Sequence, residues 1–515
     1  MAPLAVLCLA AVLLLVNLQY WPPPWYDEGA HLQVSRNLAV DGRYGIWSAG
    51  EFRSFDPLIS VGPTVTLPIA LSFKWFGVGL TQGRIVMVVY ALFALWCFML
   101  VARHVFDAAT ASVAALWVLA FPSYSADVTS SVLALCRSAL GEVPALLFVT
   151  AGILTWFKAL DGKSTRLLFG AGLLFGLAAI TKSQTMLVLV GMAGLWFTDR
   201  VWHRQLDTRH VAIPVVVAIA CASAWSGVER YAAGAVDAQW FAEVQGGLVT
   251  RALMGLWIPG ALFRNAGALS ASGTLIWGLP SLLYGLYLCR IRDLQGVKRS
   301  LLLLIAVTWL IWFVVGSVGW LRYAVVGVAF LSMFTAKLFA VLTGGFAIWQ
   351  PGDASENVTP TRRINAPNIA VAIAVALMIA SPLQGTFRKE MLNRDSTAMQ
   401  FAAHLDSVVP PGAVVEAFEA EIVFLSARDF RQPSLDVVMR TVRQPRAETP
   451  NGLDFYQLSR DSTYLVNGPM SKRTSLFGLS LARGCCSLLY QFGDYDLYQL
   501  GPTDRLGEGS PRAAR

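Results

Sequence analysis

Long apolar runs separated by short polar segments fill the first three quarters of the chain. A membrane-spanning helix needs about 20 mainly apolar residues. Runs that come near this length lie at 3–18, 84–102, 110–122, 143–158, 167–181, 184–198, 211–227, 272–289, 301–316, 321–340 and 367–382. The pattern predicts a mainly α fold, a polytopic helical bundle of about eleven transmembrane helices.

The first apolar run ends at three consecutive prolines, residues 22–24. A cleaved signal peptide is the alternative interpretation of this run. No Lys or Arg precedes the run, and no clear small-x-small cleavage site follows it. We therefore interpret the run as a transmembrane helix.

A mixed polar segment, residues 20–83, follows the first run. Its apolar part, 61–78, carries Pro63, Pro68 and Lys74. These residues favour a juxtamembrane helix that lies at the interface over one that spans the bilayer.

Lys and Arg collect in alternate loops, which sets the predicted orientation. The basic loops contain Arg103; Lys158, Lys163 and Arg166; Arg200, Arg204 and Arg209; Arg290, Arg292, Lys298 and Arg299; and Arg362 and Arg363. The positive-inside rule makes these loops and the N-terminus cytoplasmic. Segments 20–83, 123–142 and 228–270 and the C-terminal tail are then extracytoplasmic; the loop 228–270 holds Trp240, Phe241, Arg251, Trp257 and Arg264.

The chain changes character after the last apolar run, which divides it into a transmembrane domain, 1–382, and a tail, 383–515. Asp395 and Ser396 are placed to cap a helix that runs to Val409, before Pro410-Pro411-Gly412. Short β-rich runs follow at 413–418, 422–425, 464–466 and 495–500. The tail is predicted to be a small extracytoplasmic α/β domain whose last dozen residues are disordered.

Composition supports a membrane protein. The chain is 56% apolar and 14% charged, whereas a soluble domain has about 25% charged residues. The net charge of +8 does not indicate nucleic-acid binding, because the basic residues sit in short loops and no such motif is present. The seven cysteines show no CxxC or zinc spacing. Cys485 and Cys486 are adjacent, so a strained vicinal disulfide between them is an open alternative.

Two adjacent carboxylates, Asp27 and Glu28, follow the first span. Carboxylates near the membrane cost free energy unless they have a partner or a task. His31 lies four residues after Asp27, on the same helical face if the stretch is helical, which suits a general base oriented by a neighbour or a weak metal site. The alternative is an ordinary solvated helix start, where Asp and Glu are common.

Further charges lie on the same predicted face. Glu142 begins an apolar run, and Lys182, Arg322 and Arg137 lie at the external ends of others, with Tyr323 next to Arg322. A helix-capping role for the carboxylate and snorkelling of the cations are the alternatives. Together, acids and cations on one face suit a transfer reaction in which a base takes a proton from a hydroxyl and cations stabilise a departing phosphate.

Several motifs, in their order along the chain, resemble one family. They are Tyr26-Asp27-Glu28-Gly29-Ala30-His31-Leu32 with Ser35-Arg36-Asn37-Leu38 and Asp41-Gly42-Arg43-Tyr44; Gly62-Pro63-Thr64-Val65; Arg84; Arg137 to Glu142 with Pro144-Ala145-Leu146; Gly176-Leu177-Ala178 with Thr181-Lys182; and Trp320-Leu321-Arg322-Tyr323. Over residues 1–340 the chain resembles the GT-C membrane glycosyltransferases, in particular the protein O-mannosyltransferase and aminoarabinose transferase (ArnT)-like branch.

The resemblance implies a GT-C fold and a function. The donor would be a polyprenyl-phosphate-linked sugar, transferred with inversion on the extracytoplasmic face of a bacterial inner membrane. Asp27 would be the catalytic acid/base, Glu28 its support or an acceptor contact, and Glu142 the second acid. The remaining roles are donor-phosphate binding by Lys182, Arg322 and Arg137, and a substrate pocket that includes Tyr26, His31 and Tyr323. The scheme requires no metal, and a divalent ion is left open.

Two departures leave the acceptor open. Aminoarabinose transferases carry a lysine before Pro-Pro-Leu, where this chain reads Phe55-Asp56-Pro57-Leu58. Eukaryotic protein O-mannosyltransferases carry a β-trefoil insert, for which no loop here is long enough. The acceptor could be a glycan, a lipid or a protein. Alternative functions are a ligase or polymerase of carrier-linked glycans, a polyprenyl-lipid transporter or flippase, and an assembly or sensing protein that binds through its tail.

Overall fold

The computed structural model covers most of the chain. It describes residues 3–55, 59, 61–122, 131–232, 254–346, 349–350, 363–364, 366–434, 437, 456, 458–482, 484 and 486–501. The predictions for Trp240, Phe241, Arg251, Cys485 and the last dozen residues fall outside this described part.

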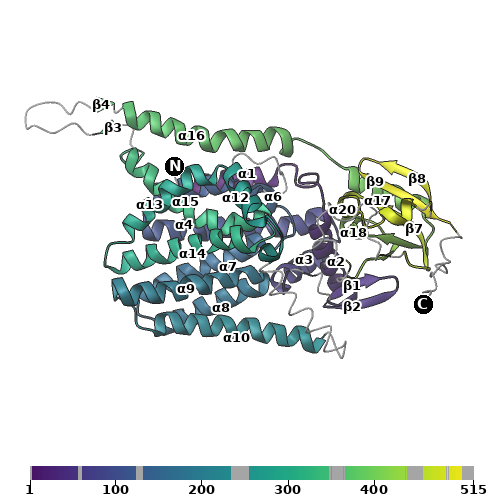
Figure 1. Cartoon of the computed structure of the whole chain (residues 1–515), viewed down its shortest axis with the longest axis horizontal. Helices are drawn as coiled ribbons and strands as arrows, with labels where there is room; N and C mark the ends of the chain where they lie inside the picture. Colours follow the sequence, from purple (N-terminus) through teal and green to yellow (C-terminus); the bar gives the residue numbers. More distant parts are fainter. Residues whose placement is uncertain are drawn as a thin grey trace, which may run out of the picture.

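A helical bundle makes up one end of the molecule and a sheet-containing unit the other, with α2 and α3 between them (Figure 1). The helices of the bundle are α1 (Pro3–Leu15), α4 (Leu80–Val105), α5 (Ala108–Leu119), α6 (Val132–Leu135), α7 (Glu142–Asp161), α8 (Thr165–Thr181), α9 (Leu187–Thr198), α10 (Arg209–Ala232), α12 (Ala261–Ala271), α13 (Thr274–Leu288), α14 (Leu294–Gly316), α15 (Val325–Leu342) and α16 (Ala366–Thr386). Short 3-10 turns, η2 (Ser183–Met186) and η5 (Leu321–Ala324), precede α9 and α15.

The described helices confirm an integral membrane protein. Six of them are long and apolar enough to cross a bilayer, or seven if α12 and α13, which meet at 88°, form one broken span. Helices α1, α5 and α8 are apolar but shorter. The count of about eleven spans therefore stays a prediction.

The long external loop predicted at 228–270 is partly wrong. Helix α10 continues to Ala232, and α12 occupies 261–271 within the predicted loop. Loop prediction failed here because α12 mixes apolar residues with Arg264 and Asn265. The Asn265 amide is buried and donates to the Ser317 carbonyl oxygen at 2.8 Å, so a polar residue serves helix packing.

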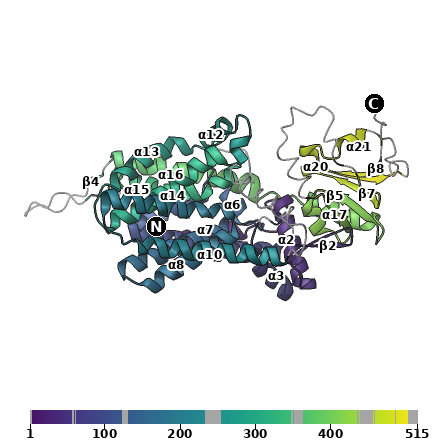
Figure 2. The same ribbon diagram turned by 60° about the horizontal axis from the view of Figure 1, so that its bottom comes forward.

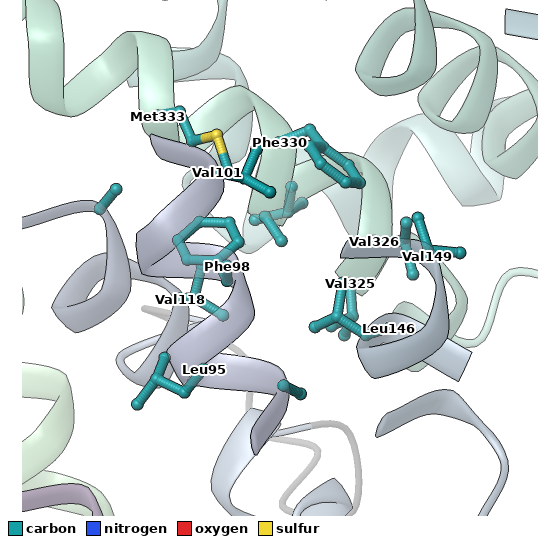
Figure 3. Close-up of a cluster of buried hydrophobic side chains, with 14 of the residues drawn as sticks. Leu95, Phe98, Val101, Val118, Leu146, Val149, Val325, Val326, Phe330 and Met333 are labelled. Atoms are coloured by element: carbon teal, nitrogen blue, oxygen red, sulfur yellow. The ribbon is translucent and has the colours of Figure 1, made fainter. Parts of the chain in front are cut away.

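The centre of the bundle is a buried apolar cluster from α4, α5, α7 and α15. Figure 3 shows side chains from these helices gathered together, among them Phe98, Val118, Val149 and Phe330, all nearly or fully buried. Close packing of this kind fixes the relative positions of the helices. The same helices, α7 and α15, carry charged residues at their ends, so the core determines where those charges lie.

The segment after α1 forms two helices and a hairpin. Helix α2 (Tyr26–Asp41) ends at Gly42, whose φ of 69° is left-handed and suits glycine. Strands β1 (Gly45–Ser48) and β2 (Glu51–Ser54) pair antiparallel. Helix α3 (Pro63–Phe76) confirms the predicted helix within 61–78 and packs against α2 and α4.

The C-terminal unit is a five-stranded mixed sheet in the order β6-β5-β7-β9-β8. The strands are β5 (Val414–Ala417), β6 (Asp429–Arg431), β7 (Ser462–Asn467), β8 (Cys486–Phe492) and β9 (Tyr495–Leu500). Helices α17 (Thr397–Val408) and α20 (Pro469–Thr474) lie on opposite sides of it (Figure 2). Strand β5 is parallel to β6 and β7, whereas β9 is antiparallel to β7 and β8.

Three of the four predicted strands and the predicted helix are confirmed in this unit. The Asp395 carboxylate accepts the backbone N–H of Thr397 at 2.9 Å and so caps the start of α17. The strand predicted at 422–425 is wrong, because this stretch lies in helix α18 (Ala420–Leu425). A four-residue apolar run has no periodicity that separates a strand from a buried helical turn.

An ion cluster lies at the end of the bundle away from α2, and its loss should destabilise the protein. Lys298 of α14 is buried, and its Nζ lies 2.6 Å from the Asp161 carboxylate and 3.0 Å from His104 Nε2. Lys298→Met should lower the free energy of unfolding by about 2 kcal/mol, because Asp161 loses its cation but is 42% exposed and partly rehydrates. Thermal unfolding in detergent, followed by tryptophan fluorescence, measures this loss.

The control for this prediction is Lys337→Met. Lys337 pairs with Asp107 at 3.0 Å, but the two side chains are 28% and 43% exposed, so the change should cost less than about 1 kcal/mol. Equal losses in the two variants would contradict the conclusion that the buried contacts of Lys298 stabilise the bundle.

Candidate active site

Four helix ends bring two carboxylates and two cations together. Asp27 lies in the first turn of α2, and Glu142 is the first residue of α7. Lys182 follows the last residue of α8, and Arg322 lies in η5, just before α15. Acids at helix N-termini and a cation at a helix C-terminus are favoured by the helix dipoles. Arg322 opposes this rule and depends on the carboxylates beside it.

The charges are paired across these helices. Arg322 Nη2 donates to Asp27 Oδ2 at 2.6 Å, and Lys182 Nζ lies 3.2 Å from Glu142 Oε1. Arg322 Nε is 3.8 Å from the same Glu142 oxygen, so the pairs form one cluster. The side chain of Asp27 is 24% exposed, whereas those of the other three are 5–9% exposed. Asp27 is therefore the member that a second molecule can reach.

Close backbone contacts hold the helix ends in this arrangement. A Cβ on Gly141 would lie 3.0 Å from Lys182 Cδ and 3.2 Å from the Thr181 carbonyl oxygen, so glycine lets the start of α7 meet the end of α8. The Thr64 and Thr181 hydroxyls hydrogen-bond at 2.7 Å. This bond ties the start of α3 to the end of α8, next to Lys182.

Aromatic rings surround the guanidinium of Arg322. Its Cζ lies 4.7 Å from the ring centre of Trp25, 4.5 Å from that of Trp320 and 5.2 Å from that of Tyr323. Lys182 Nζ is 5.7 Å from the Tyr323 ring. Such contacts stabilise a cation without using its hydrogen-bond donors, so Arg322 keeps donors for a ligand.

An anion-sized space adjoins this cluster. Arg322 Nη1 is buried and has no hydrogen-bond partner among the residues that the structure describes. A cavity lies beside it, lined by residues that include Glu142, Lys182, Trp309, Trp312, Arg322 and Tyr323. A buried donor without a partner costs free energy, and an anionic ligand in this cavity would supply one.

The electrostatics keep Asp27 ionised and His31 neutral. Burial raises the pKa of Asp27, but Arg322, His31 and Lys182 outweigh it, and the net pKa lies below the ordinary 3.8. Burial lowers the pKa of His31 to about 4. His31 Nδ1 is 2.6 Å from the Ala139 carbonyl oxygen, which can only accept, so Nδ1 carries the proton. At neutral pH the site thus presents a carboxylate beside a neutral imidazole.

Glu28 does not join the cluster. Its side chain is fully buried and receives two hydrogen bonds from Arg84, at 2.9 and 2.7 Å. Arg84 also donates to the carbonyl oxygens of Leu18 and Pro22. Glu28 further accepts the Ala139 N–H at 3.2 Å. Its carboxylate therefore ties the start of α2 to α4 and to the segment before α7, and none of its side chain is exposed.

Arg137 and Tyr26 also lie apart from the four charges. The Arg137 guanidinium stacks 4.8 Å from the Trp21 ring centre and donates to the Val16 carbonyl oxygen at 2.5 Å. The structure therefore does not bring this predicted phosphate contact to Lys182 and Arg322. The ring of Tyr26 meets Phe418 of the C-terminal unit edge-on at 5.0 Å.

Sequence reasoning missed the aromatic wall of the site. Trp25, Trp309, Trp312 and Trp320 were not among the candidates, although the chain has 17 tryptophans. Their only sequence signal is position, since Trp25 precedes the acidic pair and Trp320 precedes Arg322. For a metal, the described residues offer no group of three His, Cys, Asp or Glu side chains placed to hold an ion.

One segment of the chain matches a known protein family in sequence. Residues 60–226 match the family model described as dolichyl-phosphate-mannose-protein mannosyltransferase. This segment includes Glu142 and Lys182 but neither Asp27 nor Arg322. No curated protein sequence matches the chain.

Solved structures match almost the whole chain. The apo structure of ArnT from Cupriavidus metallidurans matches with a TM-score of 0.60 and 15% identity, over 97% of this chain and 98% of that one. The structure of that ArnT bound to undecaprenyl phosphate has a TM-score of 0.59 and 14% identity, over the same shares of both chains.

An archaeal protein shares the same architecture. The oligosaccharyltransferase AglB from Archaeoglobus fulgidus, in complex with an inhibitory peptide and a dolichol-phosphate, has a TM-score of 0.57 and 12% identity over 98% of this chain and 74% of that one. The predicted resemblance is confirmed by these matches: the chain has the GT-C membrane glycosyltransferase fold, with ArnT-like architecture and a mannosyltransferase-type sequence segment at 60–226.

Proposed function

We propose that this protein is a membrane glycosyltransferase that moves one sugar from a polyprenyl-phosphate donor to an acceptor hydroxyl, with inversion and with Asp27 as the base. The observation that carries the proposal is the surroundings of Arg322. This buried cation is bonded to Asp27 through one nitrogen, and its Nη1, beside a cavity, has no hydrogen-bond partner in the described part of the chain. A donor phosphate would satisfy that nitrogen and use Lys182 as its second cation.

The cation pair also suggests how the base becomes active. Arg322 keeps the pKa of Asp27 low, which makes the free carboxylate a weak base. A bound phosphate would compete for Arg322, weaken its bond to Asp27 and raise the basicity of that carboxylate. The acceptor hydroxyl would then attack the anomeric carbon while its proton passes to Asp27. The bond from that carbon to the phosphate oxygen breaks, and Arg322 and Lys182 balance the charge of the leaving phosphate.

The lining of the cavity supports a monosaccharide attached to a long apolar carrier. Its lining combines the two cations with aromatic side chains, which suits a monosaccharide, hexose or pentose, attached to a phosphate. Trp309, Trp312 and Val326 give one wall an apolar character. ArnT from C. metallidurans, with which this chain shares its fold, has been solved with undecaprenyl phosphate, and we assign the same type of carrier. The acceptor is a glycan, lipid or protein hydroxyl.

The proposed function includes an orientation of the protein in the membrane. We propose that the N-terminus is cytoplasmic and that Asp27, the cavity and the C-terminal unit, from about residue 383, face the extracytoplasmic side of a bacterial inner membrane. The basic loops at 158–166 and 200–209 support this orientation.

Replacement of Asp27 tests the reaction. Asp27→Asn should lower turnover of polyprenyl-phosphate sugars by at least about 100-fold, because the amide cannot accept the proton. Purified enzyme in detergent, assayed with a panel of such donors, measures it. Asp41→Asn is the control, since Asp41 is the last residue of the same helix and accepts a bond from Trp47. Full activity of the Asp27 variant would contradict the role, and turnover with nucleotide sugars alone would contradict the donor class.

Replacement of Arg322 tests the coupling of cation and base. Arg322→Gln should raise the pKa of Asp27, because burial then acts with less opposition. Since the base works only when ionised, the acid limb of the pH–activity profile should move to higher pH. Profiles normalised to each variant's maximum separate this shift from the loss of donor binding. Lys337→Gln, in the helix α15 that follows Arg322 but paired with Asp107, should leave the limb in place. An unmoved limb in the Arg322 variant would argue against the coupling.

Cysteine labelling tests the topology. In a background without native cysteines, Glu51→Cys should react with an impermeant maleimide from outside intact cells, and Lys163→Cys should react only after permeabilisation. Both positions are exposed. The reverse pattern would overturn the orientation.

A further inference from the structure

The C-terminal unit packs directly on the helix that carries Asp27. A Cβ on Gly29 of α2 would collide with the backbone of α18, at Ala420 and the Glu421 amide nitrogen. Gly29 lies two residues after Asp27, so the contact covers the first turn of α2. Only glycine allows α18 to approach this closely.

Further contacts hold the two parts together along α2. Arg36 donates to the carbonyl oxygens of Val423 and Phe424, at 3.4 and 3.2 Å. The Gln432 amide donates to Gln33 at 3.2 Å. Docking therefore extends over two turns beyond Gly29, and α2 is held by the bundle on one side and by the C-terminal unit on the other.

Glu421 is an unusual residue at this contact. It is 3% exposed, its Oε1 accepts the Tyr495 hydroxyl at 2.9 Å, and its Oε2 is buried without a hydrogen-bond partner in the part of the chain that the structure describes. No cation pairs with it among those residues. A buried carboxylate in such surroundings is costly unless it is protonated.

Burial and two neighbouring carboxylates favour the neutral form of Glu421 and outweigh the hydrogen bond from the Tyr495 hydroxyl. Burial, the neighbouring Glu419 and, more weakly, Asp27 raise the pKa of Glu421 to about 8. Other charged or titratable groups also lie on the elements packed against α18. On α2 they are Glu28, His31, Asp41 and Arg36, which faces the C-terminal end of α18; on α17 they are His404 and Asp406, which binds the Ser426 hydroxyl; on β9 it is Asp496. At neutral pH Asp27 is thus ionised and Glu421 is not, which keeps a second negative charge away from the base.

We propose that the C-terminal unit is a working part of the active site, in which α18 sets the position of Asp27 through Gly29 and Glu421 acts as a positioning residue in its uncharged form. This inference rests on the proposed function for its catalytic readout. Ionisation of Glu421 would place an unpaired buried charge at the contact with α2 and separate α18 from it. The geometry of Asp27 toward donor and acceptor would then be lost, and small misplacements at a reacting centre lower the rate strongly.

Gly29→Ala tests the contact. The extra methyl group must push α18 away, so kcat should fall about tenfold or more with little change in donor KM. Hydrogen exchange of the full chain in detergent should show faster exchange of the 26–35 amides. Gly267→Ala is the matched control, because Gly267 is also helical, and a Cβ there would meet nothing within 4 Å. Equal behaviour of the two variants would overturn the proposal.

Variants of Glu421 test whether its uncharged side chain acts as a positioning residue. Glu421→Gln keeps an oxygen that can accept the Tyr495 hydroxyl and is always neutral, so its activity at pH 7 should exceed that of Glu421→Ala. Wild-type kcat should fall as the pH rises through about 8, and this alkaline limb should be absent from the Gln variant. An identical limb in both proteins, or a Gln variant as impaired as the Ala variant, would contradict the role.

The exchange measurement separates this proposal from the proposed function. If wild-type protein turns over no polyprenyl-phosphate sugar, the function falls, but the exchange rates of the Gly29 and Gly267 variants still decide whether α18 holds α2. If wild-type protein is active and the two variants match in both rate and exchange, only the inference falls.

Discussion

The bond between Arg322 and Asp27 is the interaction on which the rest of the site depends. It joins the first turn of α2 to the start of α15, and Glu142 and Lys182 complete the cluster from α7 and α8. Four charges at this degree of burial are tolerable only because they neutralise one another. The cluster is therefore a structural joint between four helices, and under the proposed function an anionic ligand would rearrange its charges.

The two neighbouring carboxylates after the first span have different surroundings. Glu28, fully buried, is committed to Arg84 and to the backbone of Ala139. Asp27, one residue earlier, pairs with Arg322 and stays partly exposed. Under the proposed function, the first of these contacts fixes α2 in the bundle and Asp27 serves the chemistry. The C-terminal unit adds a third acid, Glu421, kept neutral at the same helix.

Sequence alone predicted the membrane bundle, the C-terminal unit and four of the charges that converge. These predictions worked because long apolar runs and unexpected charges beside them carry a strong physical signal. Arg137 was misplaced because a cation that stacks on Trp21 has the same local sequence character as one that awaits a phosphate. The aromatic wall and the contact of Gly29 with α18 could not be predicted, since both join residues far apart in the chain. The strand predicted at 422–425 failed because four apolar residues fit either a strand or a helical turn.

The most direct test of the account is a cryo-EM structure of the protein with undecaprenyl phosphate bound. We expect the phosphate beside Arg322 Nη1 and Lys182, the prenyl chain along Trp309 and Trp312, and a longer distance between Arg322 and Asp27 than the present 2.6 Å. A phosphate bound elsewhere, for example at Arg137, with the bond between Arg322 and Asp27 unchanged, would contradict it.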